Sequence, residues 1–360
     1  MKKRNSLIAL ALVLAFGLVG CGNNAAKNNA GSNAAKDGAD KASDVKVGFV
    51  TDEGGINDQS FNQGVWEGLT KAKDDLGVDA TYVESKDSNA YKPNLETVLD
   101  EGSDLIVGAG FKMGDAIIEE AKANPDVKYA IVDVDPEGAA DNLQGIMFKA
   151  EEPSFLVGYI AGLTTKTDKV GFVGGQEGNI IWGFEYGYKA GVDYAAKQLG
   201  KKIEVASQYV GGFTDAQKGK AIATQMYQNG ADIVFHAAGG AGDGVIEAAK
   251  EQGKWAIGVD RDQSNMAPDN VLTSAMKNAN VAVYNLVKQL KENGEFKGGE
   301  TIYYGLKDEG AVGIAPTSDK HVAKDVLDKT EQVKKDIIDG KIVVPNNKET
   351  YEKYTAELNK

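Results

Sequence analysis

Short apolar runs rich in β-branched residues alternate with longer amphipathic stretches along most of this chain. In the first half, such runs predict strands at residues 45–50, 81–84, 104–108 and 129–134. Apolar residues at helical spacing predict helices at residues 64–76 and 113–124. Strands that alternate with helices of this length are typical of a parallel sheet with helices on both faces. The first half of the chain therefore predicts an α/β lobe.

The same order of elements begins again near the middle of the chain. Residues 169–173 read KVGFV and repeat residues 46–50 letter for letter. A five-letter match between Val-rich strands also arises by chance, but the order of elements recurs as well. It predicts helices at 184–199 and 216–229 and strands at 204–210, 232–237 and 256–259. We therefore predict a second, similar α/β lobe.

The C-terminal third provides too few elements for a third lobe. Its pattern predicts strands at 271–276 and 301–305 and a helix at 281–292. These elements are best used to complete the two sheets, so the chain crosses between the lobes more than once. We expect lobe 1 at 45–150 and 275–305, lobe 2 at 151–274 and 306–345, and a C-terminal helix or tail at 346–360. Two lobes joined in this way form a hinged clamp with its ligand in the cleft.

The first 44 residues depart from this pattern. Residues 1–20 begin with basic side chains and continue in an apolar run, which is typical of an export signal; an uncleaved anchor helix is the alternative. Cys21 is the only cysteine, and with the preceding Leu-Val-Gly it resembles a bacterial lipobox, whose cysteine is lipidated. No large apolar side chain follows before residue 45, so we expect a flexible tether at 21–44.

The net charge of the chain limits the classes of partner that we expect. The formal net charge is −13, and it becomes −16 without the three basic residues of the signal. Such an acidic surface argues against a nucleic acid partner. No stretch after the signal approaches 18 apolar residues, so we expect a domain held at the outer face of the cell membrane by a lipid anchor.

Glycines, carboxylates and aromatic rings gather where the predicted strands end. Ligands of open α/β sheets bind beyond the carboxyl ends of the strands. The residues at these ends are Asp52 to Phe61, Gly108 to Phe111, Asp133, Gly174-Gly175, Gly211 to Phe213, Ala238 to Gly240 and Asp260. Each type also serves as an ordinary turn residue, helix cap or core ring. Their convergence on one edge of both lobes predicts a ligand cleft in which rings offer stacking faces and carboxylates accept hydrogen bonds from hydroxyl or amino groups.

Enzymatic functions have weaker support in the sequence. His236 and His321 are the only histidines and the predicted fold contains no cysteine, which excludes His–Cys zinc sites and Cys nucleophiles. No complete nucleotide-binding motif occurs, and we predict neither a metal site nor a cofactor. Asp133, Asp135 and Asp141 weakly resemble the calcium-binding carboxylates of nucleoside hydrolases, but they lack the paired aspartates and follow the fourth strand instead of the first. We expect His236 to be a packed strand-end residue.

Several motifs, taken in order, resemble one family. They are TDEGGINDQSFNQGVWEGL (51–69), GAGF (108–111), FEYGYKAGV (184–192), YVGGFTDAQKGK (209–220) and GVDRDQ (258–263). Together with the lipobox they are similar to the basic membrane protein family, the PnrA-like purine nucleoside-binding lipoproteins of ABC transporters. The resemblance extends to about residue 342. It implies the type I periplasmic binding protein fold, with two Rossmann-like lobes and a three-crossover hinge.

The resemblance also implies roles for individual residues. Two rings, one from each lobe, stack on the purine in this family, and the matching positions are Phe61 and Phe213. The groups that match those reading the base are Asp52, Asn62 and Asp133. The groups that match those holding the ribose are Gly239, Asp260 and Lys277, of which the lysine is alternatively a surface residue. Trp182 departs from the family pattern and is a candidate for a further cleft ring.

The implied function is uptake of a purine nucleoside such as adenosine, guanosine or inosine. The implied partners are an ABC transporter permease and the membrane, and we expect a monomer. Other heteroaromatic ligands or sugars are alternatives for the same clamp. A nucleoside hydrolase and a surface antigen without a ligand are alternatives from other classes.

Overall fold

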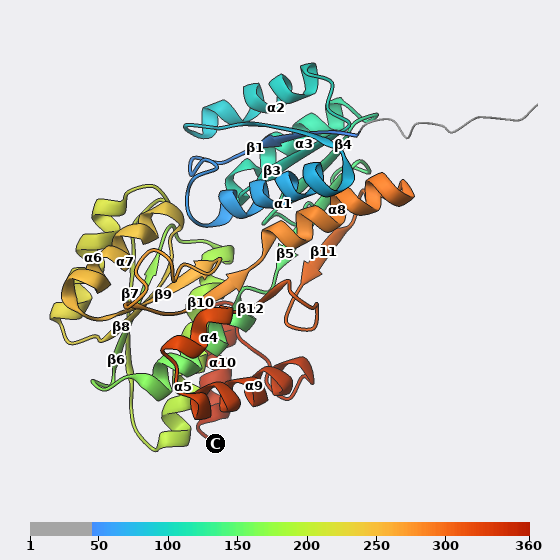
Figure 1. Cartoon of the computed structure of the whole chain (residues 1–360). Coiled ribbons are helices and arrows are strands. Elements are labelled where there is room, and N and C mark those ends of the chain that lie inside the picture. Colours follow the sequence, from blue (N-terminus) through green and yellow to red (C-terminus); the bar gives the residue numbers. More distant parts are fainter. Residues whose placement is uncertain (1–44) are drawn as a thin grey trace, which may run out of the picture. The chain divides into compact units, whose positions relative to one another are not determined.

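The structure is a computed structural model that describes residues 45–360 (Figure 1). The predicted signal, the lipidation site at Cys21 and the tether lie outside the described residues. Two six-stranded sheets organise the described part of the chain. We call each sheet with its covering helices a lobe, numbered in chain order.

The sheet of lobe 1 is entirely parallel. Its strand order is β11-β5-β4-β3-β1-β2. The strands are β1 (Lys46–Val50), β2 (Asp79–Val83), β3 (Leu105–Ala109), β4 (Lys128–Val132), β5 (Leu143–Phe148) and β11 (Thr301–Tyr304). Its helices are α1 (Phe61–Leu76), α2 (Tyr91–Asp100), α3 (Gly114–Ala123) and α8 (Ala279–Asn293). Every residue of β3 is buried because helices cover both faces of the sheet.

The sheet of lobe 2 has the same plan, with the order β12-β10-β9-β8-β6-β7. Its strands are β6 (Lys169–Gly174), β7 (Glu204–Tyr209), β8 (Ile233–Ala237), β9 (Trp255–Asp260), β10 (Val271–Lys277) and β12 (Val312–Ile314). The pairs are parallel except for β10 with β12. The identical KVGFV segments are β1 and β6, which hold equivalent places in the two sheets. The two-lobed parallel α/β fold predicted from the sequence is thus confirmed.

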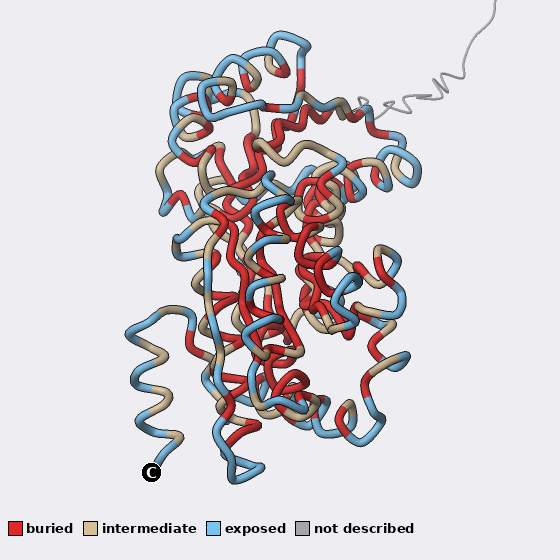
Figure 2. The backbone as a smooth tube through the Cα atoms, turned by 90° about the vertical axis from the view of Figure 1, so that its left-hand side faces the viewer, coloured by how far each residue is buried: buried red, intermediate tan, exposed pale blue. Residues whose placement is uncertain are grey.

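Six further helices belong to the second half of the fold. They are α4 (Glu151–Thr164), α5 (Asn179–Leu199), α6 (Ala216–Gln228), α7 (Gly242–Gln252), α9 (Lys324–Ile338) and α10 (Lys348–Leu358). Buried residues concentrate in the strands and in the central helices. The outer helices alternate between buried and exposed residues (Figure 2).

The chain crosses between the sheets three times. The crossovers follow β5, β10 and β11. The second lies beyond Lys277, slightly later than the lobe boundary predicted at residue 275, because β10 stays paired with β12 up to its last residue. The sequence pattern did not single out β5, β12, α2, α4 or α9.

Glycines allow α4 and α5 to pack in unusually close contact. A Cβ atom on Gly158 would lie 2.2 Å from the carbonyl oxygen of Tyr188, and one on Gly191 would lie 2.0 Å from that of Phe155. A Cβ atom on Gly187 would likewise clash with the backbone of Glu151. Gly187 and Gly191, the two glycines of the FEYGYKAGV motif, therefore serve helix packing.

Gly191→Ala is expected to lower the free energy of unfolding by roughly 1–3 kcal/mol, the usual cost of forcing extra atoms into a packed interior. Urea denaturation followed by circular dichroism measures this. Gly253→Ala is not a suitable control because its φ is +59°, whereas Gly64→Ala is, because its Cβ would have ordinary contacts. Equal stability of the two variants would contradict the packing role.

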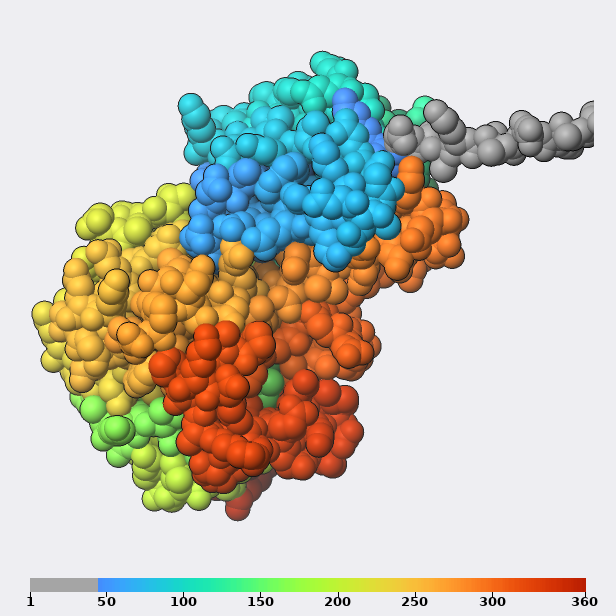
Figure 3. All heavy atoms as spheres, viewed as in Figure 1, coloured from blue at the N-terminus to red at the C-terminus, as the bar shows by residue number. Residues whose placement is uncertain are grey.

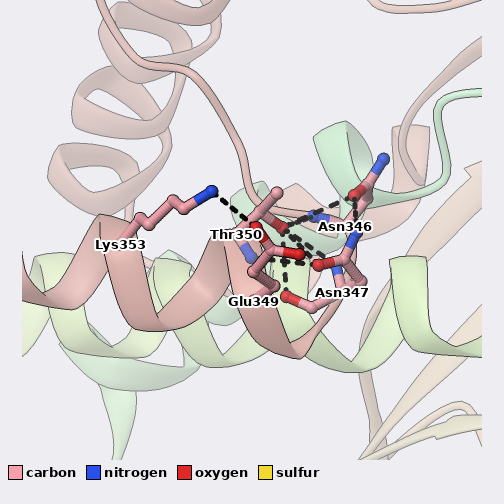
Figure 4. A network of polar contacts seen from close by, with 5 residues as sticks. All are labelled: Asn346, Asn347, Glu349, Thr350 and Lys353. Carbon is pink, nitrogen blue, oxygen red and sulfur yellow. Dashed lines mark hydrogen bonds and ion pairs between the residues drawn. The ribbon is translucent and has the colours of Figure 1, made fainter.

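The C-terminal helix α10 begins with a capping box, shown in Figure 4. The Asn347 side chain accepts a hydrogen bond from the Thr350 backbone N–H at 2.9 Å, and the Thr350 hydroxyl accepts one from the Asn347 N–H at 3.1 Å. The helix docks on α5, where the Tyr351 hydroxyl donates to Asp193 at 2.6 Å. The helix α10 is thus attached to lobe 2 through α5.

Candidate functional site: a cleft between the lobes

One cavity lies between the two lobes at the carboxyl ends of their strands. The space between its lining residues that no protein atom fills, including space open to solvent, is about 540 Å³. All eight ligand-binding residues predicted from the sequence line it: Asp52, Phe61, Asn62, Asp133, Phe213, Gly239, Asp260 and Lys277. The structure therefore brings the predicted set together, and their contact with a ligand stays a prediction.

The loop after β1 is built around the carboxylate of Asp58. It accepts hydrogen bonds from the backbone N–H groups of Ser60, Asn62 and Gln63 at 2.9–3.0 Å. These are free N–H groups at the start of α1, so Asp58 caps this helix and its negative charge suits the helix N-terminus. The crowd of polar residues in this loop is thus partly structural.

The side chain of Asn62 connects the carboxylate of Asp58 to that of Asp52. Its side-chain N–H₂ donates to Asp52 Oδ1 at 2.7 Å and to Asp58 Oδ2 at 3.0 Å. The Gly54 N–H donates to the same Asp52 oxygen at 2.9 Å. The other oxygen, Oδ2, lies against Gly110, whose missing Cβ would be only 2.8 Å away and whose φ is +99°. Glycine is required there because a side chain would displace the carboxylate.

Burial raises the pKa of the Asp52 carboxyl to about 6, although its hydrogen bonds from Gly54 and Asn62 oppose this. Burial also raises the pKa of Asp260 to about 6, against the attraction of the Lys277 charge. Both groups are ionised at pH 7.5. The cavity therefore offers two acceptors that gain from a ligand able to donate hydrogen bonds.

Lys277 lies at the centre of the cleft and contacts both lobes. Its side chain is buried, with Nζ 2.6 Å from Asp133 Oδ2 in lobe 1 and 4.0 Å from Asp260 Oδ1 in lobe 2. The Ser60 hydroxyl of lobe 1 donates to the other oxygen of Asp260. The alternative of a surface lysine is therefore wrong.

The two aspartates of this cluster end equivalent strands. Asp133 directly follows β4 and Asp260 ends β9, and these strands hold the same place in their sheets. Their φ angles are +68° and +65°, in the left-handed region that non-glycine residues seldom adopt. Such backbone strain is common at functional sites, where the surroundings hold it in place.

Aromatic rings form the apolar walls of the cavity. Lys277 Nζ lies 4.3 Å from the centre of the Phe61 ring and 5.7 Å from that of Phe184. The rings of Phe213 and Phe111, which also line the cavity, meet edge to face with centres 6.1 Å apart. Phe213 belongs to lobe 2 and Phe111 to lobe 1, so the rings also connect the lobes.

Three apolar residues outside the predicted ligand-binding set also line the cavity from the first turns of α5: Ile180, Ile181 and Phe184. Their apolar side chains recur at the spacing of one helix face, and this spacing is the sequence signal that could have identified them. Trp182 is absent from the cavity lining described by the structure; it lies with Tyr186 and Tyr209 in a separate surface hollow. Neighbouring residues of a helix point about 100° apart, which explains this separation.

The weak hydrolase resemblance does not correspond to a shared site. The Asp133 carboxylate pairs with Lys277, whereas Asp135 accepts hydrogen bonds from the hydroxyls of Thr301 and Tyr303. Within residues 45–360, no three histidine, cysteine, aspartate or glutamate side chains gather closely enough to hold a metal ion. His236 is fully buried at the end of β8, and burial lowers its pKa to about 4.

The chain matches a known protein family. The model of the family described as "ABC transporter substrate-binding protein PnrA-like" matches residues 45–348. The chain belongs to this family. Its relatives include the CD4+ T-cell-stimulating antigen of Listeria innocua, 44% identical over 96% of this chain and 99% of that protein. Basic membrane protein A of Borreliella burgdorferi is 42% identical over 87% of this chain and 91% of that protein.

Solved structures support the same assignment. An ABC transporter solute-binding protein from Aeropyrum pernix K1 superposes with a TM-score of 0.79 at 29% identity, covering 88% of this chain and 97% of that one. A second, from Conexibacter woesei, has a TM-score of 0.68 at 23% identity over 84% and 99% of the two chains, and it supports the fold alone. The predicted periplasmic binding protein fold of this PnrA-like protein is thereby confirmed. Among the described residues, no helix is long and apolar enough to cross a membrane.

Proposed function

We propose that this PnrA-like protein binds purine nucleosides outside the cytoplasm and delivers them to the permease of an ABC transporter. The observation that carries the proposal is that Phe61 of lobe 1 and Phe213 of lobe 2 line one cavity together with four aspartates. Aromatic faces suit a flat base, and carboxylates suit the N–H and hydroxyl groups of a nucleoside.

The residues divide into two groups in this proposal. Phe61 and Phe213 stack on the base, while Asp52 and Asp133 accept hydrogen bonds from its N–H groups. Asp260 and Lys277 hold the ribose hydroxyls, near the backbone of Gly239. Asn62 keeps the Asp52 carboxylate in place through its 2.7 Å hydrogen bond.

Isothermal titration with adenosine, guanosine and inosine tests the proposal, after removal of any ligand that remains bound during purification. We expect micromolar or tighter binding, about −8 kcal/mol or beyond. No heat from any nucleoside with folded protein would contradict it. Mass spectrometry of co-purified molecules separates nucleosides from the alternative heteroaromatic or sugar ligands. Release of hypoxanthine from inosine would instead favour a hydrolase.

Nucleoside affinity is expected to fall as the pH drops below 6. The carboxyls of Asp52 and Asp260, whose pKa values are about 6, are ionised above that pH and accept hydrogen bonds; protonation at lower pH removes this capacity. For one such carboxyl, affinity at pH 5 should be about tenfold weaker than at pH 7.5. Titrations at both pH values measure the change. An unchanged affinity would show that neither carboxylate accepts a hydrogen bond from the ligand.

A lipid anchor at Cys21 is the proposed attachment to the membrane. Tethering raises the local concentration of a binding protein at its permease. Cys21→Ala is therefore expected to move the protein from the detergent-extractable membrane fraction to the soluble fraction and to leave inosine affinity unchanged. Fractionation and immunoblotting measure the distribution. Retention in the membrane would instead indicate an uncleaved anchor helix at residues 1–20.

A further inference from the structure

Gln263 is a buried residue outside the cavity lining that the structure describes, and it forms a contact between the lobes. Its side-chain Oε1 accepts a hydrogen bond from the Val259 N–H at 2.9 Å and lies 3.0 Å from His236 Nε2. Its side-chain Nε2 donates to the backbone carbonyl oxygen of Gln59 at 3.0 Å. Only this last bond reaches lobe 1. The side chain is 1% exposed.

The orientation of the Gln263 amide is fixed by its neighbours in lobe 2. The backbone N–H of Val259 can only donate, so the atom facing it must be the amide oxygen. This oxygen in turn requires the proton of neutral His236 to lie on Nε2. Within residues 45–360, His236 Nδ1 has no hydrogen-bond partner, so no neighbouring group opposes this tautomer. The N–H₂ group of Gln263 is thus directed at lobe 1.

The target of this group is the loop between β1 and α1, which carries Asp52 and leads into Phe61. Gln59 has a φ of +52°, in the left-handed region, and its carbonyl precedes Ser60, which donates to Asp260. Residues 260–263 therefore contact this turn at two points, the backbone carbonyl of Gln59 and the side-chain hydroxyl of Ser60. Figure 3 shows this meeting of the lobes, where the blue start of lobe 1 touches the orange part of lobe 2.

We propose that Gln263 is a positioning residue that holds the cleft closed over its ligand by binding the Gln59 carbonyl. It adds no contact to the ligand itself. A bond that exists only when the lobes meet stabilises the closed state relative to the open one, and so it slows ligand release. Association is little affected, because it begins from the open state. The inference rests on the proposed function, in which a nucleoside is captured between the lobes.

Two variants of Gln263 remove the donor in different ways. Gln263→Glu keeps an acceptor for Val259 and His236 and places an oxygen against the Gln59 carbonyl. Gln263→Leu is uncharged and serves if the buried carboxylate of the first variant prevents folding. The matched control is Glu67→Gln, which breaks the half-exposed ion pair with Arg261 across the same seam, 2.8 Å long. Half-exposed pairs contribute little, so this control should change release less than about twofold.

Stopped-flow dissociation of inosine and a distance between spin labels together test the inference. Labels at Glu96→Cys in lobe 1 and Gln228→Cys in lobe 2, in a Cys21→Ala background, report closure; both positions are exposed. We expect the Gln263 variants to release inosine about tenfold faster with an association rate within twofold of the parent, and to shift the label distances toward longer values. Thermal unfolding should confirm that the variants are folded.

The outcomes separate this inference from the proposed function. Release rates and label distances equal to those of the parent, in a folded variant, would overturn the role of Gln263 while inosine binding still stands. If the parent binds no nucleoside but the variants still lengthen the label distance, the proposed ligand is wrong and the role of Gln263 in closure holds.

Discussion

Phe61→Ala and Phe213→Ala are each expected to weaken inosine binding by about 1–3 kcal/mol, the range found when a ring that stacks on a base is removed. This corresponds to roughly 5- to 150-fold in the dissociation constant. The two rings come from opposite lobes and line the same cavity, so each should contribute even when the other is present. Phe61 also lies beneath the Lys277 ammonium, 4.3 Å away, so its loss should cost more.

Calorimetric titration of both variants measures these losses. Trp182→Ala is the matched control because this ring lies outside the described cavity lining. Circular dichroism should remain native, since both phenylalanines are only partly buried. Normal binding by both variants would refute the stacking role and direct attention to Phe111 and Phe184.

Lys277→Met is expected to lower the free energy of unfolding by about 3–5 kcal/mol at pH 7.5, the cost of leaving a buried charge without its partner. Asp133, 2.6 Å from Nζ, and Asp260, 4.0 Å away, would both lose their cation. Asp260 already has a pKa of about 6 with Lys277 in place, and removal of the lysine raises it further. At pH 5 this carboxyl is therefore neutral and the loss of stability should be smaller.

Urea denaturation at pH 5 and pH 7.5 tests this pH dependence. Lys112→Met is the control, since Lys112 forms a less buried pair with Glu53 at 3.3 Å and should cost about 1 kcal/mol or less. A stability loss for Lys277→Met that is equal at the two pH values would show that uncompensated carboxylates are not its cause.

The location of the cleft was predictable because parallel strands bring their carboxyl ends to one edge. Asp133 and Asp260 each follow an apolar run, and this position alone places them at that edge. The apolar periodicity of α5 could also have indicated that Phe184 lines the cleft. The role of Asp58 as a helix cap follows from its place before α1.

Other features depended on tertiary contacts that sequence patterns do not encode. Helix α4 is buried on almost all sides, so it lacks the polar face by which an amphipathic helix is recognised. Lys277 resembles any surface lysine until the crossover after β10 encloses it between two carboxylates. Gln263 acquires its contact with Gln59 only where the two lobes meet.

The equivalent positions of Asp133 and Asp260 have a consequence for redesign. Each lobe supplies an aspartate from the same place in its sheet and at least one ring, so each half of the clamp contributes its own part of the recognition surface. A chimera that combines lobe 1 of one relative with lobe 2 of another would therefore inherit half of its chemical preferences from each parent. Lys277, on a strand of lobe 2, lies beside a carboxylate of each lobe. It is therefore the position at which the two halves of such a chimera would have to be made compatible.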